Sequence, residues 1–248
     1  MLVNYFFIEP MIYKVGCVIP CYKGNKKTLD VVRNVLKYVD TIVFVDDCCP
    51  YQTGLFIKEK ISKKDKLKII FNQSKLGVGG ACKLGFNYLL KEGCQIIIKI
   101  DADGQMNPHL IPKLIDPIIK GDADAVKGNR FTKVEDIKSM PKMRIFGNLG
   151  LSFLNKISTG YWELFDPTNG FLAFSRSTIA NIELEKVDNK YFFESDLLFR
   201  CALNNIYFAQ MRMQGVYENE SSSLEPIKEI FRFSYKHFLN FFKRIFYQ

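Results

Sequence analysis

The sequence contains little histidine and no long uncharged segment, and each shortage excludes a class of protein. Its 248 residues include only two histidines, His109 and His237. We therefore do not expect a mechanism in which histidine activates a serine or cysteine nucleophile. The longest runs without a charged residue are 145–155 and 201–211, far shorter than the ~20 apolar residues that cross a bilayer. We expect no transmembrane helix within this chain.

Signals for secretion and for a structural metal are also missing. The first fifteen residues contain Glu9 and lack a basic segment followed by a small-residue cleavage site, so no secretory signal is expected. The seven cysteines are an odd number, and no pair of C-x-x-C motifs or nearby histidine completes a zinc site. We expect reduced thiols in a cytosolic environment.

What is present is the composition of a folded globular chain with a basic balance. Apolar residues make up 48% and charged residues 25%, and the net charge is +9. The length suits one large domain with a sizeable core. The charge raises a basic nucleic-acid-binding protein as an alternative of a different class. Because the basic residues are dispersed outside the C-terminal segment and no nucleic-acid motif is present, we expect no nucleic-acid partner.

The first half of the chain alternates short apolar runs with longer amphipathic ones. We predict strands at 15–20, 41–45, 67–71 and 95–100, and helices at 28–38, 52–62 and 77–91. Strands separated by helices in this way form a parallel sheet with right-handed crossovers. The predicted fold class is therefore α/β, a Rossmann-like, mostly parallel sheet flanked by helices. Further along we predict an amphipathic segment at 139–160, a strand at 171–174 and a helix at 191–202.

Polar side chains follow the predicted strands closely. They are Tyr22, Asp46, Asp47, Asn72, Asp101 and Asp103. In open α/β sheets, ligands bind in the crevice at the carboxyl ends of the strands. The order of residues alone thus places a candidate site at that edge of the sheet.

Asp101 and Asp103 are the strongest candidates for chemistry. Two carboxylates one residue apart at a strand end can share a divalent cation that prefers oxygen ligands, and Gln105 could supply a third oxygen. Such an ion would neutralise the charge of a departing nucleotide diphosphate. D-x-D is also common in surface loops, but its place after a buried strand favours the functional interpretation.

Asp46 and Asp47 also end a strand and admit two interpretations. Their carboxylates could accept hydrogen bonds from a nucleobase or a ribose hydroxyl. They could equally form a turn or a helix cap before Pro50.

Three basic residues are candidates for binding phosphate, although a solvated surface position is the default for each. Lys75 precedes a glycine-containing helix start that matches no phosphate-loop motif, and it is a possible anion contact. Arg130 and Arg144 carry guanidinium groups, which bind phosphate with two parallel hydrogen bonds.

Glu194 and Asp196 form an acidic pair among aromatic residues. Partial burial could raise the pKa of either carboxylate toward that of a general base. The structural alternative is a charged helix N-terminus in which Asp196 pairs with Arg200, four residues later.

Together these residues resemble a known family. The segments that carry the resemblance are V-I-P-C-Y at 18–22, V-D-D at 45–47, 72–80 with Gly85, D-A-D-G-Q at 101–105, G-N-R at 128–130, D-P-T-N-G-F at 166–171 and F-E-S-D-L-L-F-R at 193–200. In this order they are similar to family 2 glycosyltransferases of the GT-A fold, in the subgroup of polyprenyl-phosphate sugar transferases that includes dolichol-phosphate mannose synthase. The resemblance covers roughly residues 15–225.

The resemblance implies a role for each matching position. Residues implied to bind the nucleotide sugar are Pro20, Tyr22, Asp46, Asp47, Lys75, Asp101, Ala102, Asp103, Arg130, Asp166, Asn169 and Gly170. Mg²⁺ or Mn²⁺ would be bound by Asp101, Asp103 and Gln105, and the acceptor phosphate by Arg130 and Arg144. The implied catalytic residues are Asp103, Glu194 and Asp196, with the last two near the acceptor.

The implied reaction is a metal-dependent, inverting transfer of a hexose from a UDP- or GDP-linked donor to a polyprenyl phosphate. Transfer to a sugar hydroxyl in surface polysaccharide synthesis is the alternative, and it would need Glu194 or Asp196 as a base, whereas a phosphate is already anionic. A nucleotidyltransferase is disfavoured because no basic glycine-rich loop follows the first strand. One departure from the family is 217–223, which carries Glu218 and Glu220 in place of a basic stretch, so GDP-mannose is not specifically implied.

Residues 226–248 are predicted to form a basic amphipathic helix next to a catalytic domain at 1–225. Its aromatic face would hold Phe231, Phe238, Phe241, Phe242 and Ile245, and its polar face Arg232, Lys236, Asn240, Lys243 and Arg244. This pattern is typical of helices that lie on anionic membrane surfaces. The segment also resembles the juxtamembrane part of longer relatives, so we expect a protein at the cytoplasmic face of a membrane, peripheral or part of a longer anchored chain. The alternative is a terminal helix packed against the domain.

Overall fold

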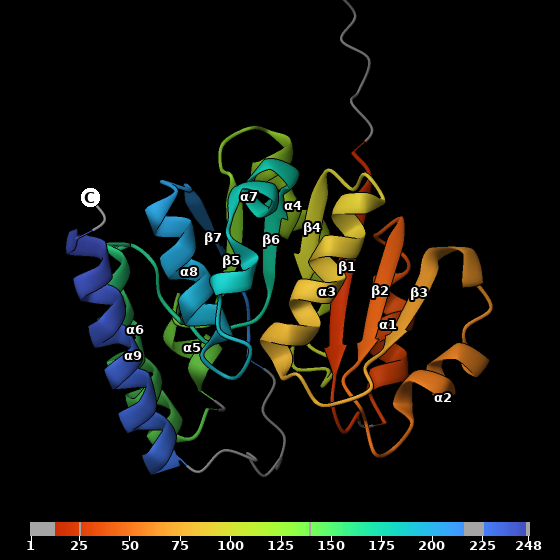
Figure 1. The fold of residues 1–248 in the computed structure, drawn as a ribbon, viewed down its shortest axis with the longest axis horizontal. Coiled ribbons are helices and arrows are strands. Elements are labelled where there is room, and N and C mark those ends of the chain that lie inside the picture. The colour runs from red at the N-terminus through yellow and green to blue at the C-terminus, as the bar shows by residue number, and fades with distance from the viewer. Residues whose placement is uncertain (1–12, 25, 139, 216–225, 247–248) are drawn as a thin grey trace, which may run out of the picture.

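A computed structural model describes residues 13–24, 26–138, 140–215 and 226–246, and within these ranges seven strands form one sheet (Figure 1). The strands are β1 (Val15–Cys21), β2 (Thr41–Asp46), β3 (Leu67–Phe71), β4 (Ile96–Lys99), β5 (Ala125–Asn129), β6 (Leu172–Ser175) and β7 (Phe208–Arg212). Their order across the sheet is β3-β2-β1-β4-β6-β5-β7.

Helices cover both faces of this sheet (Figure 1). The α-helices are α1 (Thr28–Val35), α2 (Thr53–Lys60), α3 (Val78–Lys91), α4 (Ile111–Ile119), α5 (Val134–Ile137), α6 (Lys142–Thr159), α7 (Arg176–Asn181), α8 (Phe193–Leu203) and α9 (Pro226–Phe246). Short 3₁₀ helices lie at Lys64–Lys66, Pro108–Leu110 and Leu184–Lys186.

The central strands are buried on both faces, as expected of parallel strands between two layers of helices. Successive residues of β1 point to opposite layers. Ile19 packs in the core formed with α1 and α4, whereas Val18 packs in the core formed with α3 and α8. Gly85 of α3 lies directly against Val18, where an added Cβ would overlap the valine side chain. This double burial fixes the strands in register and brings the carboxyl ends of β1, β2 and β4 to the same edge.

The predicted mostly parallel sheet is confirmed, with β6 as the antiparallel strand between β4 and β5. Helix α6, which precedes β6, packs on α8 and α9 and does not cross a face of the sheet. The chain therefore re-enters the sheet at the end where β5 left it. Sequence analysis missed β5, β7 and α4, because β5 contains Lys127, β7 is only half buried and α4 is interrupted by Pro117.

Helices α6 and α9 lie side by side at the end of the molecule opposite β3 (Figure 1). Among the side chains of α9 whose burial the structure describes, Phe233, His237 and Asn240 are buried, and the His237 Nδ1 atom lies 2.9 Å from the Ser158 hydroxyl of α6. Within the described ranges, no helix combines the length and apolarity that a bilayer-spanning helix needs. The division of the chain at residue 225 stays a proposal.

Helix α9 packs against the domain, but not through the aromatic stripe. Phe231, Phe238 and Phe242 are exposed. Of the side expected to be polar, Lys236 forms an ion pair with Asp188 and Asn240 is buried. Part of the polar face therefore points into the protein, which corrects the expectation that all of its basic residues would be available to lipid headgroups.

Candidate active site

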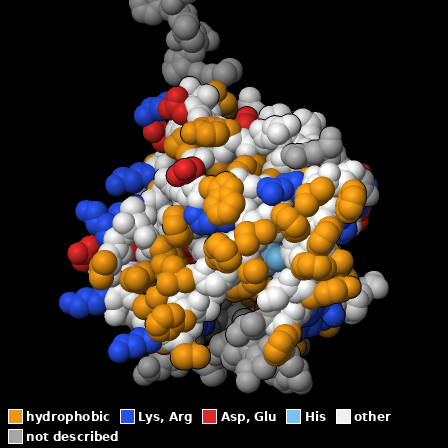
Figure 2. All heavy atoms as spheres, turned by 90° about the vertical axis from the view of Figure 1, so that its left-hand side faces the viewer, with side chains coloured by type: hydrophobic (Ala, Val, Ile, Leu, Met, Phe, Trp, Pro, Cys, Tyr) orange, Lys and Arg blue, Asp and Glu red, His pale blue; other side chains and the backbone are white. Residues whose placement is uncertain are grey.

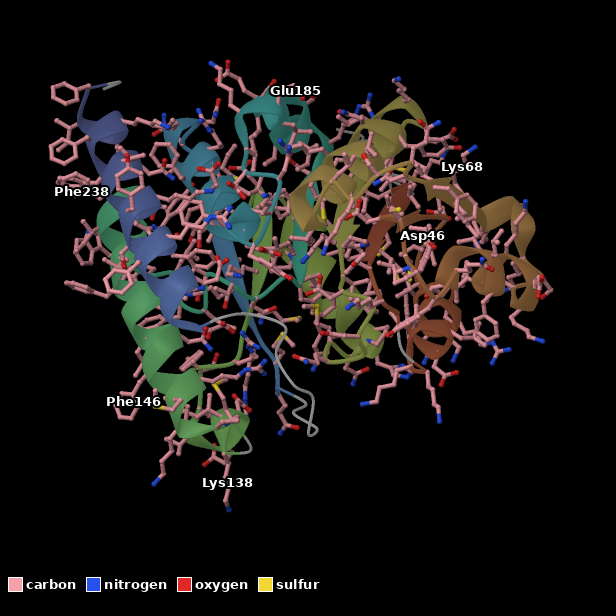
Figure 3. All side chains as sticks on the ribbon, turned by 60° about the horizontal axis from the view of Figure 1, so that its bottom comes forward. Asp46, Lys68, Lys138, Phe146, Glu185 and Phe238 are labelled. Atoms are coloured by element: carbon pink, nitrogen blue, oxygen red, sulfur yellow. The ribbon has the colours of Figure 1, made fainter. Side chains whose placement is uncertain are left out.

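The residues predicted to form the site follow the strands at one edge of the sheet, which lies at the bottom of Figure 1 and comes forward in Figure 3. Asp46, labelled in Figure 3, ends β2 there. The loops after β1, β4 and β5 reach the same edge. Strands β1 and β4 run parallel to β2, and β5 runs in the same direction as β4 because the β6 strand between them is antiparallel to both. The edge thus gathers the candidate residues that sequence order predicted.

Tyr22 and Lys75 are in contact with each other at this edge. Tyr22 follows β1 and is 40% exposed, and the Lys75 ammonium nitrogen lies 3.6 Å from the centroid of its ring. This is a cation–π contact. Pro20 is buried in β1 just before them. An exposed ring beside a cation suits a nucleobase and a phosphate, although that contact stays a prediction.

Asp46 organises the loop that follows β2. Its Oδ1 and Oδ2 atoms accept hydrogen bonds from the backbone N–H groups of Cys49 and Gly54, each at 2.7 Å. Gly54 must be glycine for this contact, because an added Cβ would lie 2.8 Å from Asp46 Oδ2. The carboxylate therefore holds the turn into α2, as the turn interpretation expected.

Asp47 organises the neighbouring loop, before α3. Its Oδ1 accepts from Asn72 Nδ2 and Leu76 N, and its Oδ2 from Gly77 N, all at 2.8 Å. Three donors on one nearly buried carboxylate fix the approach to the α3 N-terminus. Any contact of Asp46 or Asp47 with a nucleoside stays a prediction.

Asp101 and Asp103 lie in the loop after β4. Asp103 Oδ1 accepts a hydrogen bond of 2.9 Å from the Gln105 backbone N–H, which is an Asx turn. The Ala102 carbonyl accepts a hydrogen bond of 2.9 Å from the Thr28 hydroxyl, so the loop is anchored on the start of α1. Both carboxylates are partly exposed. They are thus presented at the edge in a fixed loop.

The chemistry of these donors fits a divalent ion that is shared with the substrate. Within the part of the chain that the structure describes, no group of three or more His, Cys, Asp or Glu side chains is arranged to hold a metal. Mg²⁺ is commonly held by one or two carboxylates together with substrate phosphates, and Mn²⁺ takes the same oxygen ligands. Asp101 and Asp103 match that pattern, with Gln105 next in the loop.

Lys99, in the last position of β4, is fully buried and contacts two carboxylates. Its Nζ atom lies 2.6 Å from Asp101 Oδ1 and 2.8 Å from Glu194 Oε1. Burial alone would lower the pKa of this lysine, but the charges of Asp101 and Glu194 outweigh it and raise the pKa above its ordinary value. Lys99 is therefore a buried cation between the two acids.

Arg130, directly after β5, forms an ion pair with the buried Asp166 in the loop before β6. Arg130 donates from Nε to Oδ2 and from its terminal nitrogen to Oδ1, both at 2.6 Å. Burial would raise the pKa of Asp166, but the Arg130 guanidinium prevails and holds the pKa below its usual range. Sequence analysis proposed both residues without pairing them. The guanidinium proposed to hold a phosphate is thus engaged by a carboxylate.

Asn169 and Gly170 continue this loop. Asn169 Nδ2 donates to Asp166 Oδ2 at 3.1 Å, and the Asn169 carbonyl accepts from the buried Lys127 ammonium at 2.5 Å. Burial lowers the pKa of Lys127 to about 7. At Gly170 an added Cβ would lie 2.7 Å from Asp101 Oδ2. The loop backbone therefore packs directly on the D-x-D segment.

Glu194 and Asp196 begin α8 but have different partners. Glu194 faces Lys99, whereas Asp196 Oδ2 accepts from the Asp188 backbone N–H at 2.8 Å and its Oδ1 from Asn240 Nδ2 at 2.9 Å. Asp196 thus joins α8 to α9, and the pair with Arg200 expected in the structural alternative is replaced by this contact. Arg200 instead donates to the Lys186 carbonyl at 3.5 Å.

Arg144 lies in the first turn of α6 with an exposed side chain. It therefore projects from the helix pair, whereas Arg130 is turned inward to Asp166. Binding of an acceptor phosphate by either arginine stays a prediction. The segment 217–223, which departs from the family pattern, lies outside the described residues.

Sequence analysis missed the buried lysines and the anchor of α9. Lys99 and Lys127 each interrupt an apolar strand, and a charge in a buried strand must have a partner. That interruption was the available signal. Nothing in the local sequence of Asn240 indicates its bond to Asp196, 44 residues away in the chain.

Comparison with known proteins agrees with this geometry. Residues 17–182 match the family model for glycosyl transferase family 2. The chain is 30% identical over 217 residues to the UDP-N-acetylglucosamine–dolichyl-phosphate N-acetylglucosaminyltransferase of Methanococcus voltae, aligned over 82% of this chain and 86% of that protein. It is 29% identical over 193 residues to the undecaprenyl-phosphate mannosyltransferase of Micrococcus luteus, aligned over 76% of this chain and 78% of that protein.

A solved structure shares the fold. The glucosyl-3-phosphoglycerate synthase of Mycobacterium tuberculosis, crystallised with Mn²⁺ and UDP-glucose, superposes with a TM-score of 0.67 at 16% identity and covers 94% of this chain and 79% of its own. At that identity the likeness shows the GT-A fold alone. The family model, in contrast, matches well over half of the chain in sequence. This protein therefore belongs to glycosyltransferase family 2 and is a glycosyltransferase.

Proposed function

We propose that this enzyme transfers a hexose from a nucleotide diphosphate sugar to a polyprenyl phosphate at a membrane surface, with inversion at the anomeric carbon. The observation that carries the proposal is the packing of the α6–α9 pair, in which polar side chains of both helices are buried while several of their aromatic side chains are exposed. Ser152, Asn155 and Ser158 of α6 are buried, as are His237 and Asn240 of α9.

The outer faces of the same helices are apolar. Phe146 and Phe153 of α6, and Phe231 and Phe238 of α9, are each more than half exposed. Figure 2 shows hydrophobic side chains gathered over this face, and in Figure 3 the rings of Phe146 and Phe238 point away from the domain. A large exposed apolar patch marks an interaction surface, and aromatic residues beside basic ones suit a lipid interface. A lipid-linked acceptor would therefore meet the enzyme here.

The state of the acidic pair supports an anionic acceptor. A sugar hydroxyl would need a base to take its proton, yet Glu194 is paired with Lys99 and Asp196 is bound to the Asp188 amide and Asn240. A phosphate oxygen is already ionised at neutral pH and needs only to be placed in line. Glu194 and Asp196 then orient the acceptor side of the site.

On the donor side, the nucleoside would lie along Pro20, Tyr22 and the loops of Asp46 and Asp47, and its diphosphate near Lys75. Asp101, Asp103 and Gln105 would hold Mg²⁺ or Mn²⁺, which supplies charge neutralisation for the leaving diphosphate. The Ala102 backbone would lie near the ribose.

The sugar would rest on the loop of Asp166, Asn169 and Gly170, which Arg130 and Lys127 hold rigid. Arg130 would reach a phosphate only as part of its pair with Asp166. Arg144, exposed on α6, is the better placed of the two to meet the phosphate of a membrane-bound acceptor. Attack by that phosphate on the face of the sugar opposite the leaving group inverts the anomeric carbon.

The relatives support this choice of substrates. Two are named for transfer to dolichyl or undecaprenyl phosphate, one of them from UDP-N-acetylglucosamine. We also propose that the reaction takes place at the cytoplasmic face of a membrane, with the chain peripheral through α9 or part of a longer anchored protein. Both UDP- and GDP-sugars belong in the test.

The test is a transfer assay with radiolabelled UDP- and GDP-sugars, Mg²⁺ or Mn²⁺, and either a polyprenyl phosphate or the matching polyprenol. We expect a labelled lipid with the phosphate and none with the alcohol. Arg144→Ala should raise the KM for the lipid phosphate more than the KM for the donor. Transfer only to sugar hydroxyls would refute the acceptor class, and a rise confined to the donor KM would refute the role of Arg144.

A further inference from the structure

Lys99 places one positive charge between the two halves of the proposed active site. Its ammonium is fully buried and touches Asp101 Oδ1 at 2.6 Å and Glu194 Oε1 at 2.8 Å. Asp101 belongs to the D-x-D loop, whereas Glu194 comes from α8, 95 residues after Lys99 in the chain. One cation thus sets the relative position of a donor-side and an acceptor-side carboxylate.

The surroundings of Lys99 leave Asp101 little freedom. Lys99 holds Oδ1, and the backbone of Gly170 packs against the pair so closely that an added Cβ would overlap the ammonium and lie 2.7 Å from Oδ2. Without a cation here, the partly exposed Asp101 and the buried Glu194 would be neighbouring like charges and would repel each other. The ammonium therefore both neutralises the acids and fixes the direction in which Asp101 points.

We propose that Lys99 is a positioning residue: it orients Asp101 for the metal–diphosphate complex and ties it to Glu194 at the acceptor side. This inference rests on the proposed function, since it takes Asp101 as a ligand of the metal that arrives with the donor. Lys99 itself does not touch substrate. Its effect on the reaction passes through the carboxylate that it holds.

A simpler role for Lys99 is to neutralise buried acids for folding alone, and a charge-balanced variant separates the two roles. Lys99→Met leaves Asp101 and Glu194 uncompensated, so it should melt below the wild type. Lys99→Met combined with Glu194→Gln removes one charge of each sign and restores the local charge of the wild type. We expect the double variant to recover the melting temperature that the single variant loses.

The decisive measurement is Mn²⁺ binding in the presence of UDP or GDP. Binding is monitored through the electron paramagnetic resonance signal of free Mn²⁺. If Lys99 positions Asp101, the double variant binds Mn²⁺ at least about tenfold more weakly than the wild type despite its equal charge and restored stability. Lys83→Met is the matched control, because Lys83 is a buried lysine whose ammonium donates to the carbonyls of Glu185 and Val187. It should lower the melting temperature and leave Mn²⁺ binding unchanged.

The outcomes distinguish this inference from the proposed function. If the double variant binds Mn²⁺ with the same affinity as the wild type, the positioning role is overturned and the proposed function still stands. Failure of the wild type to bind Mn²⁺ with either nucleotide would overturn the proposed function and this inference together. Weaker Mn²⁺ binding by Lys83→Met, to the same extent as by the double variant, would show that the loss of any buried lysine has this effect and would overturn the positioning role.

Discussion

The acidic residues of the site are held by partners within the protein before any substrate arrives. Asp46 and Asp47 bind loop amides, Asp166 binds Arg130, and Glu194 binds Lys99. Such preorganisation means that the carboxylates do not have to be ordered during the reaction. Asp103 is held in its loop through the hydrogen bond that it accepts from the Gln105 amide.

Asp103→Asn should abolish transfer and leave the fold intact. The amide oxygen of asparagine can still accept the Gln105 hydrogen bond, so the Asx turn survives. The loss of a carboxylate ligand should lower kcat by roughly a hundredfold or more. A steady-state assay combined with a thermal melt checks both parts. Full activity of this variant, or of the wild type in EDTA, would contradict the metal assignment.

At the scale of elements, α9 is attached to the rest of the protein through polar side chains that contact Asp196, a residue proposed for the acceptor side of the site, and the neighbouring Asp188. Asn240 binds Asp196, and Lys236 is paired with Asp188, whose neighbour Asn189 accepts from the backbone of Gly79 at the start of α3. The attachment therefore touches the same loop that packs on the donor half. His237 completes it through the Ser158 hydroxyl of α6.

Acid should weaken this attachment through His237. Burial lowers the pKa of His237 to about 4, so the folded protein keeps a neutral ring while the unfolded chain binds a proton below about pH 6.5. The stability that depends on this residue is complete above about pH 6.5 and is lost as the pH falls toward 4, by roughly 2 kcal/mol at about pH 5. Urea unfolding at about pH 7.5 and 5 should show a larger fall for the wild type than for His237→Gln.

The other histidine supplies the control. His109 is exposed and lies against Tyr38, far from α9 in the sequence. His109→Gln should therefore retain the full acid-dependent loss of the wild type. If His237→Gln loses as much free energy of unfolding in acid as the wild type does, other groups govern the acid sensitivity.

At the scale of the whole molecule, exposed aromatic side chains gather over α6 and α9. The exposed rings of α6 and α9 come from segments more than sixty residues apart and form one face only because the two helices lie side by side (Figure 2). Removing α9 altogether would expose Asp196 and the buried polar residues of α6. Point substitutions on the outer face are therefore the cleaner probe of membrane binding.

Phe146→Ser combined with Phe238→Ser should weaken binding to phospholipid vesicles. Each ring contributes roughly 2 kcal/mol when it leaves water, so the double variant should bind at least tenfold more weakly. Co-sedimentation with neutral and anionic vesicles measures this, and anionic vesicles should bind the wild type more tightly because of nearby basic residues. Phe56→Ser, on α2 and also exposed, is the matched control and should bind as the wild type does. If the wild type, the double variant and Phe56→Ser bind the vesicles equally, this face is not the membrane contact.

Much of the fold and the location of the site could be read from the sequence alone. The apolar runs 15–20, 41–45 and 67–71 predicted strands that the structure contains, and the polar residues after them lie at one edge. The D-x-D segment and the family resemblance follow from residues that are adjacent in the chain. Periodicity and motifs are local properties, so they are visible without coordinates. The same is true of the amphipathic pattern of 226–248.

Only the tertiary structure decided which charged groups meet and which way the last helix turns. Lys99 and Glu194, Arg130 and Asp166, and Asp196 and Asn240 are pairs separated by 95, 36 and 44 residues. No local pattern selects one partner over another at such separations. The choice is made by burial, because a charge or polar group removed from water must find a partner within hydrogen-bond reach. For the same reason Lys236 and Asn240 of α9 face Asp188 and Asp196, whereas the rings of Phe231, Phe238 and Phe242 are exposed.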